Sequence, residues 1–142
     1  MKISKRGRYG IRLLIDLAEN CCGDHVTLLS AAIRQSISAR YLEQVAIILR
    51  RAGFTRSIKG ASGGYALAKP AEEIIIGDVL RALEGDMLIA EPPPDGCGKL
   101  QQCIWRKVFE PLNRRIAEII DSETLASLIK NSKHSDEYMY FI

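Results

Sequence analysis

The polar and basic side chains between residues 38 and 64 have types and spacings that suit contact with nucleic acid. Arginine can donate two hydrogen bonds to guanine, glutamine can pair with adenine, and glutamate can accept a hydrogen bond from cytosine. Further cations can neutralise phosphates, and glycines let a backbone approach a duplex closely. The candidate DNA-binding residues are Lys5, Arg8, Tyr9, Ser38, Arg40, Tyr41, Glu43, Gln44, Arg56, Lys59, Gly60, Gly63 and Gly64.

Charge is distributed unevenly along the chain. Residues 1–70 contain twelve Lys or Arg and four Asp or Glu, a net charge of +8, whereas residues 71–142 contain eight and thirteen, a net charge of −5. This asymmetry predicts a half that binds a polyanion, joined to a half with another task. The alternative is that the basic and acidic faces only solvate the fold.

The candidate base-contacting residues are expected on the third of three helices. Apolar spacing predicts helices at residues 9–20 and 28–33, the second of them capped by Thr27. The third helix should begin after Ser38, its expected N-cap, and should end at Gly53. Its expected buried stripe is Leu42, Val45, Leu49 and Ala52.

A hairpin is predicted directly after this helix. Residues 54–59 and 64–68 alternate as two short strands, and the glycine-rich stretch 60–63 forms the tip between them. A helix–turn–helix followed by a basic hairpin is the layout of a winged helix-turn-helix domain. The competing interpretation is an ordinary tight hairpin that contacts no DNA.

A long helix is predicted from residue 100 to residue 121. Its apolar face is wide, and such a helix outside a compact domain commonly packs on a copy of itself. Pro111 removes a backbone hydrogen bond to Lys107, so a kink or a restart of the helix is expected there. The expected dimerisation residues are Ile104, Trp105, Val108, Leu112, Ile116 and Ile119.

The predicted fold class is α+β and mostly helical: a winged helix-turn-helix domain with a two-stranded wing, and a long C-terminal dimerisation helix. The expected domains are a DNA-binding domain at 1–85, a flexible Pro/Gly-rich loop at 86–99, and the dimerisation helix with a docked apolar tail at 100–142. No apolar run approaches the roughly 18 to 20 residues that cross a bilayer. A cytoplasmic protein without a membrane partner is therefore expected.

The four cysteines are Cys21, Cys22, Cys97 and Cys103, expected as reduced thiols or ligands in the cytoplasm. The first two are expected to be small buried hydrophobes. Cys97 and Cys103, at C-x5-C spacing, could be redox-sensing thiols. No bound metal or cofactor is expected.

Several motifs resemble the bacterial regulator family that includes IscR, CymR and NsrR. They include K-I-S-K-R-G-R-Y-G at 2–10, S-A-R-Y-L-E-Q at 38–44 and K-G-A-S-G-G-Y-A-L at 59–67. The resemblance covers nearly the whole chain and implies a homodimeric winged-helix transcription regulator of operator DNA. Lys59 stands where the family usually has Arg, which puts minor-groove insertion by a planar guanidinium in doubt.

Within this family the chain is most similar to the CymR-like repressors of cysteine metabolism. Cluster-binding members carry three cysteines ahead of the tryptophan of the long helix, whereas only Cys97 and Cys103 precede Trp105 here. A [2Fe–2S] cluster needs four ligands, which two subunits of a dimer, or Cys21, Glu or Asp, could complete, but the sequence requires neither. The tail at 137–142 also resembles the CymR-like branch. The resemblance implies a repressor of cysteine or sulfur genes with a cysteine-synthase-like protein as a co-regulator.

Two other functions compete with this interpretation. One is an iron–sulfur or thiol redox-sensing regulator that uses Cys97 and Cys103. The other is a small enzyme or an interaction module without DNA binding. The sequence has no phosphate loop, no paired histidines and no nucleophile elbow, so enzymatic activity is not expected.

Overall fold

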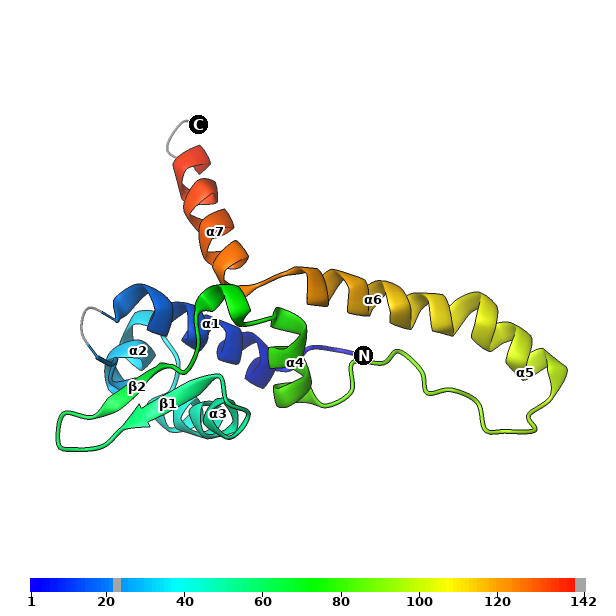
Figure 1. Cartoon of the computed structure of the whole chain (residues 1–142), viewed down its shortest axis with the longest axis horizontal. Helices are drawn as coiled ribbons and strands as arrows, with labels where there is room; N and C mark the ends of the chain where they lie inside the picture. Colours follow the sequence, from blue (N-terminus) through cyan, green and yellow to red (C-terminus); the bar gives the residue numbers. More distant parts are fainter. Residues whose placement is uncertain (22–23, 140–142) are drawn as a thin grey trace.

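The first four helices and a hairpin form a body from which a long helical arm extends (Figure 1). This architecture comes from a computed structural model that describes residues 1–21 and 24–139. The elements of the body are α1 (Lys5–Asn20), α2 (Leu28–Gln35), α3 (Ala39–Arg51), β1 (Thr55–Ile58), β2 (Gly64–Leu67), η1 (Ala71–Glu73) and α4 (Ile76–Glu84). The later elements are α5 (Lys99–Ile104), η2 (Trp105–Phe109), α6 (Glu110–Ser122) and α7 (Leu125–Met139). The predicted α+β class and winged helix-turn-helix layout are confirmed.

One apolar core holds the body together. Leu13 and Leu17 of α1, Leu49 of α3 and Val79 of α4 are almost completely buried in it. Leu125, the first residue of α7, is buried in the same core, so the chain returns to the body after the arm. Helix α7 then continues to Met139. Residues 140–142 of the apolar tail that was expected to dock lie outside the described residues.

The predicted helix caps are present. The Oγ1 atom of Thr27 accepts from the Ser30 amide at 3.2 Å, and the Oγ atom of Ser38 accepts from the Tyr41 amide at 3.4 Å. Gly53 follows α3 with φ +85°, a conformation that glycine adopts at little cost. The prediction of a buried Ala52 was wrong: Ala52 is exposed. Ala46 is buried instead, because it lies one turn from Leu42 and Leu49 on the core side of α3.

A buried carboxylate joins α1 to α2. Asp16 is 1% exposed and accepts two hydrogen bonds from the guanidinium of Arg34, at 2.7 and 3.0 Å. Gln35 donates a third, at 3.0 Å. The hydrogen bonds to Asp16 are the main reason that the pKa of Arg34 lies above its ordinary value. The first two helices of the helix–turn–helix are therefore held in one orientation by a paired charge.

A second charged contact joins the body to the arm. Arg81 of α4 donates two hydrogen bonds to Asp121 of α6, each at 2.8 Å. A Cβ atom at Gly77 would lie 1.9 Å from the Asp121 carboxylate, so only glycine permits this approach. Next to the pair, the Ile76 amide donates to Glu123 O at 2.9 Å and the Leu125 amide donates to Ile74 O at 2.8 Å. The angle at which the arm leaves the body is thus fixed by side chains and backbone together.

The Arg81–Asp121 pair should weaken in acid. The pKa of Asp121 is lowered from 3.8, chiefly by the hydrogen bonds from Arg81. Because the folded-state pKa is the lower one, the pair stabilises fully above the unfolded-state pKa and loses this effect as the pH falls through the folded value. We expect Asp121→Asn to lower the melting temperature near neutral pH and much less at about pH 3. Thermal melts followed by circular dichroism measure this; a pH-independent difference would contradict it, and Glu118→Gln is the control.

The arm is a continuous run of α5, η2 and α6 with a local change of winding. η2 is a π-helical turn, and the Glu110 amide donates to Trp105 O, five residues earlier. Pro111 then lies in the first turn of α6, where a missing amide costs little. A kink or a restart was predicted at Pro111; the helix instead continues, with its winding changed in the π-helical turn directly before this residue.

Across residues 1–21 and 24–139, no helix combines the length and apolarity needed to span a membrane.

Candidate nucleic-acid interface

The N-terminal half of α3 exposes the side chains that were predicted to contact bases. Arg40, Glu43 and Gln44 are exposed, and none has a side-chain hydrogen bond or an ion pair within the described part of the chain. Their neighbours Leu42 and Val45 are buried in the core, which fixes the rotation of the helix. Ser38 is exposed, and its hydroxyl caps the helix. The guanidinium of Arg40, the carboxylate of Glu43 and the amide of Gln44 therefore offer both hydrogen-bond donors and acceptors to a ligand.

Tyr9 and Tyr41 pack on each other. Their rings meet edge to face with centroids 5.7 Å apart and planes at 88°, which couples α1 to α3. The guanidinium of Arg12 lies 5.4 Å from the centre of the Tyr9 ring and donates to Gln35 at the end of α2. Both predicted tyrosines are half-buried. The role of Arg12 as a brace between helices was not predicted, although it follows Arg8 by one helical turn.

At the start of α1, a phosphate could be contacted by side chains but not by the backbone amides of Arg6 and Gly7, which are already hydrogen-bonded. The amides of Arg6 and Gly7 donate to Ser4 Oγ at 3.1 and 3.4 Å, and the Gly7 amide also donates to Glu84 Oε1 at 2.9 Å. Glu84 belongs to α4, so no local sequence signal predicts this cap. Because these amides are taken, phosphate contacts here depend on the exposed side chains of Lys5 and Arg8.

The hairpin is anchored to the body through residues ahead of α2. Its strands pair antiparallel with Ile58 opposite Gly64, and Val26 adds a bridge to Tyr65 through two hydrogen bonds of 2.8 Å. The imidazole of His25 also contacts the carbonyl oxygen of Ser62 near the tip. Neither His25 nor Val26 was predicted to support the wing, because the pairing joins segments about forty residues apart. Figure 1 shows the hairpin beside α3.

The glycines of the wing serve its own packing. A Cβ atom at Gly64 would lie 2.2 Å from Val26 O, and one at Gly63 would lie 2.2 Å from Ile58 O. Gly60 has φ +126°, which a tip residue with a side chain rarely adopts. Close approach of these glycines to a duplex stays a prediction. Arg56 and Lys59 are exposed and have no ion pair with any described residue.

Gly64→Ala should displace the wing from the body. The added methyl group collides with backbone and not with a flexible side chain, so the Val26–Tyr65 bridge must open. We expect faster hydrogen exchange of the Val26 and Tyr65 amides and weaker DNA binding, measured by NMR and by fluorescence anisotropy. Ala61→Ser at the exposed tip is the matched control. Unchanged exchange of both amides would contradict the prediction.

Comparison with known proteins identifies the fold and the kind of function. Residues 3–131 match the Rrf2 family, whose description is "Iron-dependent Transcriptional regulator". The chain belongs to the Rrf2 family. It is therefore a transcriptional regulator and not an enzyme, as the resemblance implied.

This Rrf2 protein is similar to members of both branches discussed above. CymR of Bacillus subtilis is 36% identical over 143 residues, covering 100% of both chains. The structure of CymR, the global cysteine regulator of B. subtilis, matches with a TM-score of 0.79 at 35% identity, covering 92% of this chain and 98% of that one. The structure of T. potens IscR matches with a TM-score of 0.72, also at 35% identity, covering 99% and 96%. Identity alone thus favours neither branch.

The cysteines that the structure describes in this Rrf2 protein, Cys21, Cys97 and Cys103, do not form a cluster site within one chain. Cys97 is half-buried beside the long helix, whereas Cys103 is exposed on it. Nowhere in residues 1–21 and 24–139 do three His, Cys, Asp or Glu side chains gather closely enough to hold a metal ion. A [2Fe–2S] cluster needs four ligands, so the described residues of one protomer do not fit it. Cys21 is exposed, against the expectation that it is buried, and Cys22 lies outside the described residues.

Proposed function

We propose that this Rrf2 protein is a homodimeric, sequence-specific repressor that binds operator DNA through α3 and the wing. The observation that carries the proposal is the exposed row of Arg40, Glu43 and Gln44 at the start of α3. The first turns of a helix seated in the major groove are the ones that reach base edges. Two such helices in a symmetric dimer would enter grooves roughly 34 Å apart or a multiple of that distance.

An exposed apolar stripe on the arm supports the homodimer. Monomeric proteins seldom leave a contiguous apolar surface of this kind in water. The stripe follows the spacing of one helix face, and its residues are 42–73% exposed: Leu100, Ile104, Val108, Leu112 and Ile119. Trp105 and Ile116 are half-buried within the protomer, so their part in a dimer interface stays a prediction. The boundaries 1–85, 86–99 and 100–142 are proposed as the functional division.

The proposed target genes are those of cysteine or sulfur metabolism, in the cytoplasm. Support comes from the likeness over the full length to a protein named the global cysteine regulator of B. subtilis. A cysteine-synthase-like enzyme is the proposed co-regulator. Co-purification of such an enzyme with the tagged regulator, and a change in DNA affinity when it is added, would support this partner.

The DNA surface is tested by two substitutions with different expected signatures. Arg40→Ala should cost about 1–3 kcal/mol on the cognate operator and relax specificity, because a base contact is lost. Lys59→Ala should weaken binding to all sequences and reduce the salt dependence by about one counterion, because a phosphate contact is lost. Fluorescence anisotropy against the protein's own promoter at several salt concentrations measures both effects. Lys130→Ala on α7, which Figure 1 places across the body from the wing, is the control, and unchanged affinity of both variants would refute the proposed surface.

A second candidate function is iron–sulfur or thiol redox sensing through Cys97 and Cys103. The family description as iron-dependent favours it, as does the position of both thiols on or beside the arm. Protein purified without air would then contain stoichiometric iron and sulfide, or would change its DNA affinity on oxidation. A Cys97→Ser/Cys103→Ser variant with the same iron content and the same redox response would exclude this function.

A further inference from the structure

The segment between α4 and α5 is tied to the arm at two places. The side-chain amide of Asn113 accepts from the Ile89 amide at 2.7 Å and donates to Ala90 O at 2.8 Å. Nearer α5, Gln102 donates to Cys97 O at 3.4 Å. Between these ties stand three consecutive prolines, Pro92–Pro94, which restrict the backbone. The segment has no helix or strand, yet its course beside the arm is defined.

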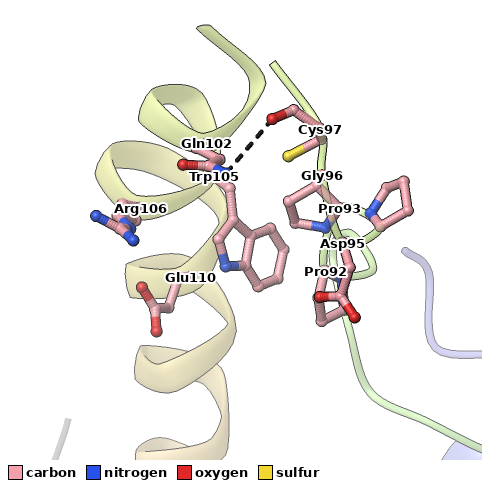
Figure 2. Close-up of a pocket in the computed structure, with 10 residues that line it drawn as sticks. Pro92, Pro93, Asp95, Gly96, Cys97, Gln102, Trp105, Arg106 and Glu110 are labelled. Carbon is pink, nitrogen blue, oxygen red and sulfur yellow. Dashed lines mark hydrogen bonds between the residues drawn. The ribbon is translucent and has the colours of Figure 1, made fainter. Parts of the chain in front are cut away.

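A hollow of about 280 Å³ lies between this segment and the arm. The segment forms one wall, and Gln102, Arg106 and Glu110 form the other, spaced four residues apart along the arm. Figure 2 shows the indole of Trp105 between the two walls. The volume lies just below the range for small-molecule sites, roughly 300 to 1,000 Å³. It therefore suits a ligand much smaller than a nucleotide.

The two walls carry opposite charges that do not pair with each other. Arg106 on the arm and Asp95 on the segment lie on opposite sides of the indole (Figure 2). Among the described residues, neither has an ion pair or a side-chain hydrogen bond. Glu110 adds a second carboxylate beside Arg106, with only a long contact of 3.9 Å to Arg114. A ligand that carried both a carboxylate and an ammonium group would complement both kinds of charge in this lining.

We propose that this hollow binds a free α-amino acid. Arg106 would hold the carboxylate through its forked donors, and Asp95 with Glu110 would hold the ammonium group. The indole of Trp105 would supply an apolar floor and a favourable face for the cation. The inference concerns a site separate from the DNA surface and holds whether or not the proposed operator function is correct.

The hollow stays open when the apolar stripe is covered. Gln102, Arg106 and Glu110 each lie two positions before a stripe residue, a rotation of roughly 200° on a regular helix. The two rows therefore lie on different faces of the arm. A neighbouring hollow of about 400 Å³ includes Ile104 of the stripe and is mostly apolar, and it shares Trp105 and Pro92–Pro94 with the proposed site. No stripe residue lines the proposed amino-acid site.

The single tryptophan of the chain reports directly on this site. Because Trp105 is the only Trp, intrinsic fluorescence of the purified full-length protein, without DNA, monitors the hollow. The probes are the twenty common amino acids, first pooled and then separately, up to millimolar concentration. We expect a saturable fluorescence change with at least one of them, matched by heat in isothermal titration calorimetry. The N-acetyl and carboxamide derivatives of the binding amino acid should each bind about tenfold weaker or less.

Substitutions then test whether Arg106 binds the carboxylate of the ligand and Asp95 its ammonium group. Arg106→Gln and Asp95→Asn should each weaken binding about tenfold or more, with unchanged circular dichroism. Lys107→Gln, the next cation along the arm and not part of this hollow, should bind normally. No response to any amino acid at millimolar concentration would overturn the proposal, as would unchanged binding by Arg106→Gln. Equal affinity for the N-acetyl derivative would overturn the zwitterionic ligand class.

Discussion

Leu112→Asp is expected to separate the dimer into monomers and to lower operator affinity about a hundredfold or more. Leu112 is 46% exposed at the centre of the apolar stripe, with Val108 one turn before it. A carboxylate there would have to lose its water, without a cationic partner, to enter an apolar interface. Each monomer would then bind one half-site, and the gain from linking two reading helices would disappear. Analytical ultracentrifugation and fluorescence anisotropy measure the two effects.

The matched control for this substitution is Glu118→Lys. Glu118 is exposed on the same helix but is not part of the stripe. The Glu118→Lys substitution should leave both the oligomeric state and the operator affinity unchanged. If Leu112→Asp remained dimeric at micromolar concentration, the stripe would not be the dimer interface. If it became monomeric yet bound the operator as tightly as before, the two-helix reading of DNA would be wrong.

Arg34→Ala is expected to lower the free energy of unfolding by about 3 kcal/mol. The arginine side chain is itself partly exposed, so its own charge is screened by solvent. The cost arises from Asp16, whose carboxylate would remain buried without a counter-charge, with the neutral side-chain amide of Gln35 as its one remaining hydrogen-bond donor among those described. Urea unfolding followed by circular dichroism measures the loss, which should appear as a lower midpoint with an unchanged slope.

A double-mutant cycle separates the burial of the charge from the packing of the side chains. Asp16→Asn removes the charge, so Arg34→Ala in that background should cost much less than in the wild type. Equal costs in both backgrounds would show that the pair is not coupled. Arg12→Ala, which removes an exposed brace between the same helices, should cost less than Arg34→Ala.

Features set by neighbours along the chain could be predicted from the sequence. Thr27 and Ser38 cap the helices that directly follow them, and Gly53 takes the backbone conformation that its place after α3 requires. The alternation that predicted two strands is also local, and β1 and β2 pair as expected. Pro111 acts on its own helix, so a local irregularity there was predictable, although its form as a π-helical turn was not.

Features that join distant segments could not be predicted in this way. Glu84 caps α1 from a position about eighty residues later, and Val26 completes the wing from ahead of α2. Asn113 and Asp121 are two of several polar residues on α6, and nothing in their spacing marked them as contacts to the rest of the chain. Their partners are chosen by the packing of the whole chain, which one sequence without its fold does not reveal. The exposed side of α3 could be predicted, because the apolar periodicity of this helix fixes which side chains face the core.

Two polar contacts of α6, made by Asn113 and Asp121, constrain how the length of this helix can change. Asn113 holds the backbone at Ile89 and Ala90, and Asp121 holds Arg81, both from fixed positions on one rigid helix. Inserting one residue between them would rotate one tie by roughly 100° against the other and shift it by about 1.5 Å. One of the two contacts would then be lost, and the stripe would turn away from its partner. Single-residue insertions or deletions between Asn113 and Asp121 should therefore be poorly tolerated, because they change both the spacing of the two contacts and the direction of the stripe.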